Sequence, residues 1–261
     1  MTNIIFDNIT FNMFVYKKGD CVSGSIMKHK SWEIPHTKEL LSALEYYSKK
    51  QNIPNHDIFV LDIGANIGWY SLILGYNGYN ILSFEPSKVN YYILLKNYCM
   101  NKNIKMTIIN KGLDIYEKNY SLYHPMNNIG NAFIFGNLSI INIQNYVKEE
   151  IILTTLNNYI TFLNKNNLAL IKLDIEGSEE KAIESGKNLI VKYHIPFIFM
   201  EWTPNLIIER GTDQKSFLEF FEKNGYKMST KGFFSREYCP IKDLIDINAI
   251  NIYIVYIKFL E

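Results

Sequence analysis

Short apolar runs alternate along the chain with longer segments whose apolar residues recur at helical spacing. Continuous apolar runs are typical of buried parallel strands, and spacings of three and four residues are typical of helices packed on one side. The expected strands cover residues 59–62, 81–85, 105–110, 169–174 and 197–201. The helices expected between them cover residues 67–74, 87–100, 156–164 and 179–193. This alternation predicts an α/β fold with a parallel sheet covered by helices on both faces.

The N-terminal residues do not follow this alternation. Residues 1–56 are expected to form a helical N-terminal extension, because Leu40, Leu41 and Leu44 place apolar side chains on one face of a helix over residues 37–50. Residues 57–261 then form the main domain. The chain of 261 residues has the length of one large α/β domain with an added element.

The C-terminal part predicts one more helix and two strands. The helix covers residues 213–224, and Gly225 follows it as a C-cap. The strands cover residues 226–230 and 250–259, and a pair of this kind would add an antiparallel strand to the sheet. Residues 120–149 are the least regular part, with Pro125, Gly130 and Gly136 among asparagines. Long irregular segments in compact domains are usually functional, so this one is expected to cover a bound acceptor.

Composition narrows the classes of partner. A formal net charge of +1 and the lack of a basic stripe argue against a nucleic-acid partner. The three cysteines are widely spaced and suit neither a metal site nor a disulfide framework, which predicts a reducing, cytoplasmic location. No apolar run is long enough to span a bilayer, and the first residues lack the pattern of a signal peptide.

The glycine turn after the first core strand carries the strongest chemical signal. Gly64 and Gly68 are separated by three residues, unlike the G-x-G-x-x-G pattern of dinucleotide sites, and no P-loop lysine follows. Asp62 precedes the turn, where an acid repels a pyrophosphate and suits a cationic ligand. This combination points to S-adenosylmethionine, which carries an amino group and a sulfonium. Glu85 ends the next strand, where an acid binds ribose hydroxyls, although a helix-capping role stays open for it.

Acidic residues also end two later strands. Asp174 and Glu176 follow one strand and Glu201 ends the next, so the three can converge at one edge of the sheet. One of them can act as general base toward an alcohol, or two or three can hold Mg²⁺ or Ca²⁺. Lys172 alternates onto the face of Asp174 and can pair with an acid. Two structural roles stay open: helix N-terminal acids for Asp174 and Glu176, and a pairing acid for Glu201.

These residues resemble the FkbM family of S-adenosylmethionine-dependent methyltransferases. The resemblance rests on residues 62–68, 84–86, 171–179 and 201–202, in the expected order, and on Trp32 and Glu33 ahead of the first core strand. Asn157 departs from the pattern, because the family usually has Asp there. The resemblance implies a Rossmann-like class I methyltransferase sheet, mostly parallel with a C-terminal antiparallel strand.

The resemblance also implies roles for individual residues. It places the methionine part of the cofactor beside Asp62, Gly64, Asn66 and Gly68. It implies that Glu85 binds the ribose and that Gly112 and Asp114 lie near the adenine. It implies that Asp174, Glu176 and Glu201 face the acceptor, but it does not identify which of them is the base.

The function expected from the sequence is O-methylation of a hydroxyl on a small acceptor, a sugar or glycan, with S-adenosylmethionine as cofactor. The sequence leaves open whether the site also binds a divalent metal. One alternative is a nicotinamide-dependent oxidoreductase, which the glycine spacing argues against. A second is a binding module that keeps the cofactor site without catalysis. A third is nucleic-acid methylation, which the near-neutral charge disfavours.

Overall fold

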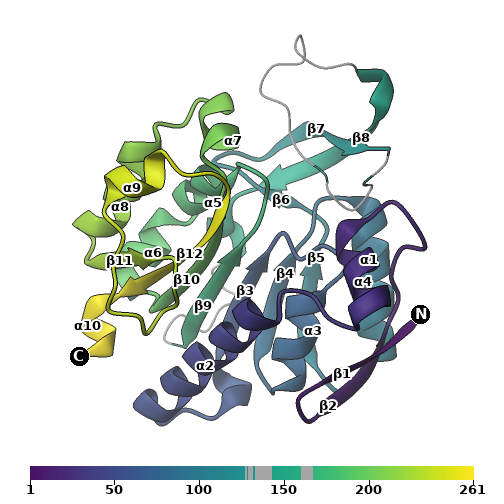
Figure 1. Cartoon of the computed structure of the whole chain (residues 1–261), viewed down its shortest axis with the longest axis horizontal. Coiled ribbons are helices and arrows are strands. Elements are labelled where there is room, and N and C mark those ends of the chain that lie inside the picture. Colours follow the sequence, from purple (N-terminus) through teal and green to yellow (C-terminus); the bar gives the residue numbers. More distant parts are fainter. Residues whose placement is uncertain (127, 129–131, 133–142, 160–166) are drawn as a thin grey trace.

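The computed structural model describes residues 1–126, 128, 132, 143–159 and 167–261. Its centre is a seven-stranded sheet with the order β11-β12-β10-β9-β3-β4-β5 (Figure 1). In chain order the strands are β3 (Phe59–Ile63), β4 (Asn80–Phe84), β5 (Lys105–Ile109), β9 (Leu168–Leu173), β10 (Phe197–Trp202), β11 (Tyr226–Ser229) and β12 (Ile250–Tyr256). The five central strands run parallel, and β12 lies antiparallel between β10 and β11. The predicted fold class, including the C-terminal antiparallel strand, is confirmed.

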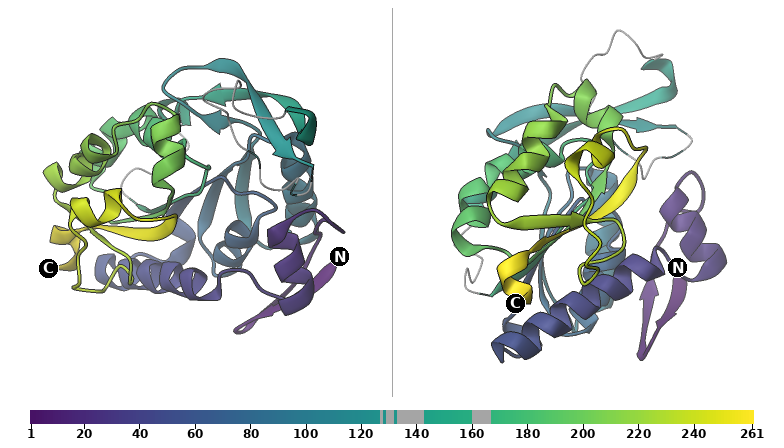
Figure 2. Two further views of the ribbon diagram at one scale, coloured as in Figure 1. Left: turned by 45° about the horizontal axis from the view of Figure 1, so that its top comes forward. Right: turned by 60° about the vertical axis from the view of Figure 1, so that its left-hand side comes forward.

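Helices cover both faces of this sheet (Figure 2). One face carries α2 (Ile34–Gln51), α3 (Trp69–Tyr76) and α4 (Lys88–Met100), and the other carries α5 (Glu179–Ser185), α6 (Lys187–Tyr193) and α8 (Gln214–Lys223). Strand residues alternate between the two layers, so Val60 belongs to the apolar cluster that includes α2, and Leu61 to the cluster that includes α5. Short helices α7 (Pro204–Glu209), α9 (Ile241–Ile245) and α10 (Ile257–Leu260) and the 3₁₀ turn η1 (Asn55–Asp57) complete this part.

The N-terminal residues contain more than a helix. A hairpin of β1 (Thr2–Phe6) and β2 (Ile9–Met13) precedes α1 (Cys21–His29) and α2. Ile4 and Phe6 are buried in the same apolar cluster as residues of α2 and α3. The helix predicted over residues 37–50 begins earlier, at Ile34, because Pro35 suits the first turn of a helix.

Two further element predictions need correction. The helix predicted over residues 179–193 is broken into α5 and α6 at Gly186, whose φ of −125° and ψ of 14° lie outside the helical region. The strand predicted over residues 250–259 ends at Tyr256, and the chain turns into α10. Of the helix predicted over residues 156–164, the structure describes only the 3₁₀ turn η4 (Leu156–Tyr159), and residues 160–164 lie outside the described part.

The segment predicted as irregular has strands at both ends. β7 (Lys118–Pro125) and β8 (Tyr146–Thr154) pair antiparallel and join β6 (Gly112–Leu113) in a second sheet, with η3 (Ile143–Asn145) before β8. This second sheet lies above the carboxyl ends of the central strands (Figure 1). Residues 127, 129–131 and 133–142 lie outside the described part, Gly130 and Gly136 among them.

The helices of the described ranges include none with the length and apolar character that crossing a bilayer requires.

Candidate active site

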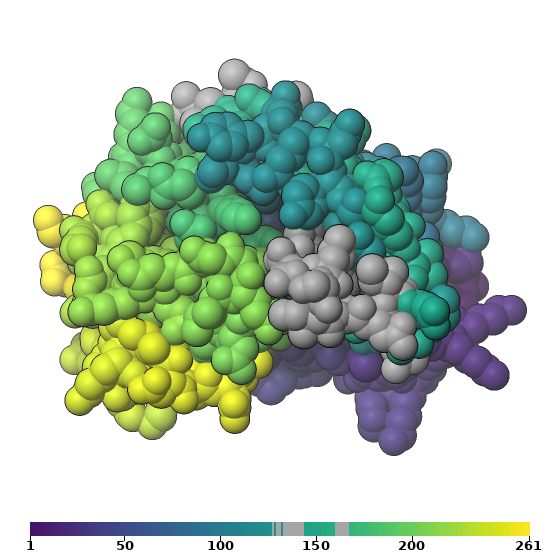
Figure 3. Space-filling model, turned by 90° about the horizontal axis from the view of Figure 1, so that it is seen from above, coloured from purple at the N-terminus to yellow at the C-terminus, as the bar shows by residue number. Residues whose placement is uncertain are grey.

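A cavity opens at the carboxyl ends of β3, β4, β9 and β10. The second sheet closes one side of it through Leu122, Ile151 and Leu153, and the segment ahead of α2 closes another through Trp32 and Glu33. Seen from this side, the blue and teal residues of the second sheet lie at the top and right, and the green and yellow residues of the C-terminal part lie on the left (Figure 3). Open α/β sheets bind their ligands at these strand ends, so the cavity is the candidate active site.

The glycine turn forms the floor of the cavity. Its backbone conformation and close packing explain why glycine stands at two of its positions. Gly64 has a φ of 81°, and a Cβ there would lie 1.9 Å from the backbone oxygen of Asp174. Gly68 has a φ of 97° and packs so closely that a Cβ would lie 2.4 Å from Leu94 Cδ1. Only glycine combines this backbone conformation with such close approach. The turn therefore lies directly against the end of β9.

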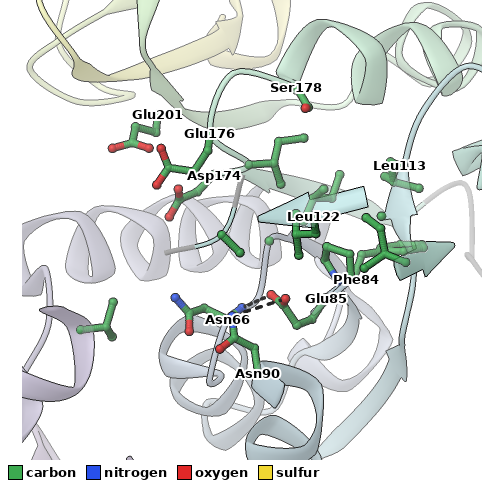
Figure 4. Close-up of a pocket in the computed structure, with 18 of the residues that line it drawn as sticks. Asn66, Phe84, Glu85, Asn90, Leu113, Leu122, Asp174, Glu176, Ser178 and Glu201 are labelled. Carbon is green, nitrogen blue, oxygen red and sulfur yellow. Dashed lines mark hydrogen bonds between the residues drawn. The ribbon is translucent and has the colours of Figure 1, made fainter. Parts of the chain in front are cut away.

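Glu85 secures the turn from the neighbouring strand. Its Oε2 accepts a hydrogen bond from the backbone N–H of Asn66 at 2.8 Å (Figure 4). Its Oε1 accepts one from the N–H of Ser87 at 2.9 Å. Burial of the side chain, which is 4% exposed, raises the pKa of Glu85 to about 7. Its carboxyl oxygens are thus held in a fixed place on the cavity wall.

The residues predicted to bind cofactor divide into two groups. Gly64, Asn66, Glu85 and Gly112 line the cavity. Asp62, Gly68 and Asp114 are not among the described residues that line it.

The two acids outside the lining have protein partners. Asp62 is 1% exposed, accepts a hydrogen bond from Ser71 Oγ at 2.5 Å, and lies 3.4 Å from Lys172 Nζ. Asp114 forms an ion pair with Lys118 at 2.9 Å. Asp62 thus pairs with Lys172 in the structure, and its direct contact with a cationic ligand stays a prediction.

Asp174, Glu176 and Glu201 come together on the wall opposite Glu85 (Figure 4). One carboxyl oxygen of each lies within 4.8 Å of the others. Glu176 adopts a φ of 54°, which a non-glycine residue rarely takes, and this turns the chain sharply after Asp174. The sequence prediction that these three acids share one edge of the sheet is therefore what the structure shows.

Crowding and burial change the protonation of this group. Burial, followed by the charges of Asp174 and Glu176, raises the pKa of Glu201 to about 9. Burial and the charge of Asp174 raise the pKa of Glu176 to about 7. Glu201 also hydrogen-bonds Asp174, so at neutral pH it carries the proton of that bond. Glu176 and Glu201 therefore both lose their protons at higher pH than free glutamic acid does.

The same three oxygens have the donor chemistry of a Mg²⁺ or Ca²⁺ site. A divalent ion held there would lower the pKa of an acceptor hydroxyl and orient it.

Lys172 lies beneath both the glycine turn and the acids. Its Nζ donates to the backbone oxygen of Gly64 at 2.8 Å and lies 3.4 Å from carboxylate oxygens of Asp62 and Asp174. Burial lowers the pKa of Lys172, but the charges of Asp174, Asp62 and Glu33 outweigh it and hold the pKa above its usual value. The predicted pairing of Lys172 with an acid is confirmed, and the lysine remains a cation.

A family model described as the methyltransferase FkbM domain matches residues 62–228 of the sequence. The match covers more than half of the chain and includes the glycine turn, Glu85 and the three acids. The chain belongs to the FkbM methyltransferase family. The sequence-based identification of an S-adenosylmethionine-dependent methyltransferase is thereby confirmed at the level of the family.

Solved structures show the same fold at low sequence identity. The chain matches WbdD with 11% identity and a TM-score of 0.52, and WbdD bound to the kinase inhibitor LY294002 with 12% identity and a TM-score of 0.53. Each match covers 92% of this chain and 45% of WbdD, described as a bifunctional kinase-methyltransferase, so this FkbM chain spans less than half of that protein.

A second likeness is to magnesium protoporphyrin IX methyltransferase ChlM from Synechocystis PCC 6803, solved with bound S-adenosylmethionine. It has 11% identity and a TM-score of 0.44, and covers 92% of this chain and 86% of ChlM. A search of curated proteins finds no match.

Some residues on the cavity of this FkbM chain have no role assigned from the sequence. Trp32, Glu33 and Ser178 were noted only as part of the resemblance, and Asp20 and Asn90 lack any motif. Trp32 and Glu33 reach the cavity because α2 packs across the sheet, which no local pattern reveals.

Replacing Glu201 by Gln is expected to make this FkbM protein progressively more stable than the wild type as pH rises. The pKa of Glu201 is raised from 4.5 to about 9, so the folded chain holds a proton that the unfolded chain releases. The wild type therefore loses stability as pH rises through this window, and the variant lacks that loss. Urea unfolding of both proteins at about pH 5, 7 and 9 measures the difference. A difference independent of pH would contradict the assignment.

Proposed function

We propose that this chain is an O-methyltransferase that moves the methyl group of S-adenosylmethionine to a hydroxyl of a sugar or glycan. The observation that carries the proposal is one cavity with Glu85 on one wall and the group of Asp174, Glu176 and Glu201 on the other. The glycine turn joins the two walls. A cofactor lying along this turn has its ribose at Glu85 and its methyl group directed at the acids.

The walls support this orientation of the cofactor. Phe84, Leu113 and Leu153 form an apolar surface beside Gly112, which suits the flat face of adenine. Asn66 and Gly64 lie between this surface and the acids, where the methionine part would extend. Asp62 would then act indirectly, by keeping Lys172 in place beneath the turn.

The acids provide the chemistry that an alcohol needs. The acceptor oxygen attacks the methyl carbon in line with the sulfur–carbon bond, which breaks and leaves its electron pair on S-adenosylhomocysteine. The acceptor proton must leave as the new bond forms, and a carboxylate within reach takes it. We assign this role to Asp174, because its partner Glu201 already carries a proton at neutral pH. Glu176 lines the same wall and is assigned to acceptor binding.

The acceptor side of the cavity supports a sugar. Trp32 offers an aromatic face, and Glu33, Glu176 and Ser178 offer polar atoms on the surrounding wall. Aromatic faces with hydrogen-bonding side chains around them suit hydroxyl-rich, flat-sided molecules. Because Trp32 and Glu33 belong to residues 1–56, we propose that this extension works as part of the 57–261 methyltransferase domain.

Tritium transfer from labelled S-adenosylmethionine to a panel of sugars tests the proposal, with calorimetry of S-adenosylhomocysteine as the binding measurement. We expect binding by the wild type and labelling of at least one sugar. A wild type that binds neither cofactor form would overturn the proposal. Binding without transfer would favour the binding module instead, and nicotinamide turnover would favour the oxidoreductase, which the family match leaves without support.

Glu85→Gln is expected to weaken binding of S-adenosylhomocysteine by about 10- to 100-fold, because hydrogen bonds from the ribose to a charged acceptor are lost. Calorimetry at about pH 8, above the raised pKa of about 7 for Glu85, keeps the wild-type carboxylate ionised. Glu45→Gln, an exposed change on α2, is the matched control and should bind like the wild type. Equal affinities of Glu85→Gln and wild type would remove the ribose role.

A further inference from the structure

Glu33 holds an unusual position on the acceptor side of the cavity. It precedes the first turn of α2 with a φ of 41° and a ψ of 47°, in the left-handed region that non-glycine residues rarely take. Its backbone oxygen accepts hydrogen bonds from the N–H and the hydroxyl of Thr37, each at 3.0 Å. The backbone is thereby locked, and the side chain lines the cavity. Strained residues of this kind are concentrated at functional sites.

The side chain of Glu33 is held by the helix that follows the glycine turn. Tyr70 donates its hydroxyl hydrogen to Glu33 Oε2 at 2.6 Å. Burial, and then the charge of Glu33, raises the pKa of Tyr70 well above its usual value, so the hydroxyl remains a donor. Trp69 Nε1 donates to Thr37 Oγ1 at 3.0 Å. Two consecutive residues of α3, directly after Gly68, thus connect the cofactor turn to Glu33.

The charges around the cavity restrict which chemical groups an acceptor can bring close to Glu33. Six of the described lining residues are acids, namely Asp20, Glu33, Glu85, Asp174, Glu176 and Glu201, and the described lining contains no Lys, Arg or His. Lys172 lies behind the wall and already contacts Asp62 and Asp174. Arg210 also lies behind the wall, where it donates to Ser178. A phosphate or carboxylate on the acceptor would therefore meet acids and no cation in the described lining.

We propose that Glu33 recognises the acceptor, accepting a hydrogen bond from a hydroxyl or ammonium group of a molecule that carries no phosphate or carboxylate, and that Tyr70 positions it. This inference rests on the proposed function, because it concerns the acceptor of the same reaction. Glu33 acts as a specificity-determining residue that contacts substrate, and Tyr70 acts through Glu33. A carboxylate that already accepts one hydrogen bond can accept others, so Glu33 can bind Tyr70 and the acceptor at the same time.

The experiment compares Glu33→Gln with the matched control Glu45→Gln, an exposed acid of α2, the helix that Glu33 precedes. The acceptor probes are methyl glycosides of glucose, galactose, mannose and rhamnose, together with glucosamine and glucose 6-phosphate. We expect Glu33→Gln to raise the KM of the best acceptor by about 10- to 100-fold with a smaller change in kcat. Its affinity for S-adenosylhomocysteine should stay within about twofold, and Glu45→Gln should match the wild type.

Two further comparisons separate recognition from a purely structural role. Tyr70→Phe removes one hydroxyl and should raise the acceptor KM by about 3- to 10-fold, whereas Tyr92→Phe, an exposed change on α4, should not. Glu33→Gln should also reduce the preference for methyl glucoside over glucose 6-phosphate, and a loss of packing alone leaves that ratio unchanged. A larger loss for glucosamine than for the neutral glycosides identifies an ammonium as the partner of Glu33.

The outcomes are distinguishable. A wild type that labels a sugar while Glu33→Gln keeps its acceptor KM and selectivity overturns the role of Glu33 and leaves the proposed function standing. A wild type that prefers glucose 6-phosphate overturns the exclusion of anionic acceptors. Cofactor binding with no labelling of any probe defeats the proposed function, and the role of Glu33 falls with it.

Discussion

Asp174→Asn is expected to slow methyl transfer by about 10²- to 10⁴-fold, the usual contribution of a positioned general base. The amide cannot take the acceptor proton, although it keeps the shape of the carboxylate. It also replaces the charged acceptor of the hydrogen bond from Glu201 by a neutral amide oxygen. The cofactor contacts proposed at Glu85 and Asn66 lie on the other wall and stay intact.

Single-turnover rates with labelled cofactor measure this effect separately from acceptor binding and product release. Calorimetry with S-adenosylhomocysteine should give an affinity within a few-fold of the wild type. Asp7→Asn, a change at an exposed acid of the N-terminal hairpin turn, is the control and should keep full activity. If Asp174→Asn retains the wild-type rate while Glu176→Gln loses it, the base is Glu176 and the assignment made here is wrong.

Lys172→Met is expected to lower the free energy of unfolding by about 3–5 kcal/mol, because removal of one partner leaves buried charges without compensation. Lys172 is 3% exposed and Asp62 is 1% exposed, so solvent cannot replace the lost cation. The raised pKa of Lys172 means that its contribution is complete below the ordinary lysine pKa of about 10.4 and is lost only as pH rises through the folded value. The full effect is therefore expected at neutral pH.

Urea unfolding at neutral pH, followed by circular dichroism, measures the loss. Lys242→Met, at an exposed position on α9, is the matched control and should change stability by less than about 0.5 kcal/mol. Lys172→Met should also weaken cofactor binding, because Lys172 holds the backbone oxygen of Gly64. A variant as stable as the control would show that the ion pairs with Asp62 and Asp174 contribute nothing net.

The parallel core could be predicted because buried strands and their crossover helices leave local signals. The runs ending near Asp62, Glu85 and Asp174 are apolar on both faces, and turn residues follow them directly. The elements that were missed lack such signals. In β7 and β8 the burial is partial and the pairing joins residues far apart in sequence, such as Lys118 and Leu153. Local pattern cannot specify that pairing.

The site could be predicted where function depends on strand ends, and not where it depends on packing between distant elements. Asp174, Glu176 and Glu201 follow from sheet topology, because parallel strands end at a common edge. The contribution of Glu33 depends on how α2 lies against α3, which only the three-dimensional core decides. Asp62 lies near the end of a strand, where the motif predicts a cofactor role, and the ion pair with Lys172 that the structure adds comes from the pairing of β3 with β9.

The contact between Gly64 and the backbone of Asp174 has a consequence for changing the enzyme's substrates. Because the two main chains touch, the spacing between the proposed cofactor turn and Asp174, the proposed base, is built into the scaffold. Side-chain replacement elsewhere leaves that spacing untouched. Trp32 and the second sheet border the acceptor without forming part of this contact. Libraries confined to those two borders should therefore alter which molecule is methylated while the transfer step keeps its geometry.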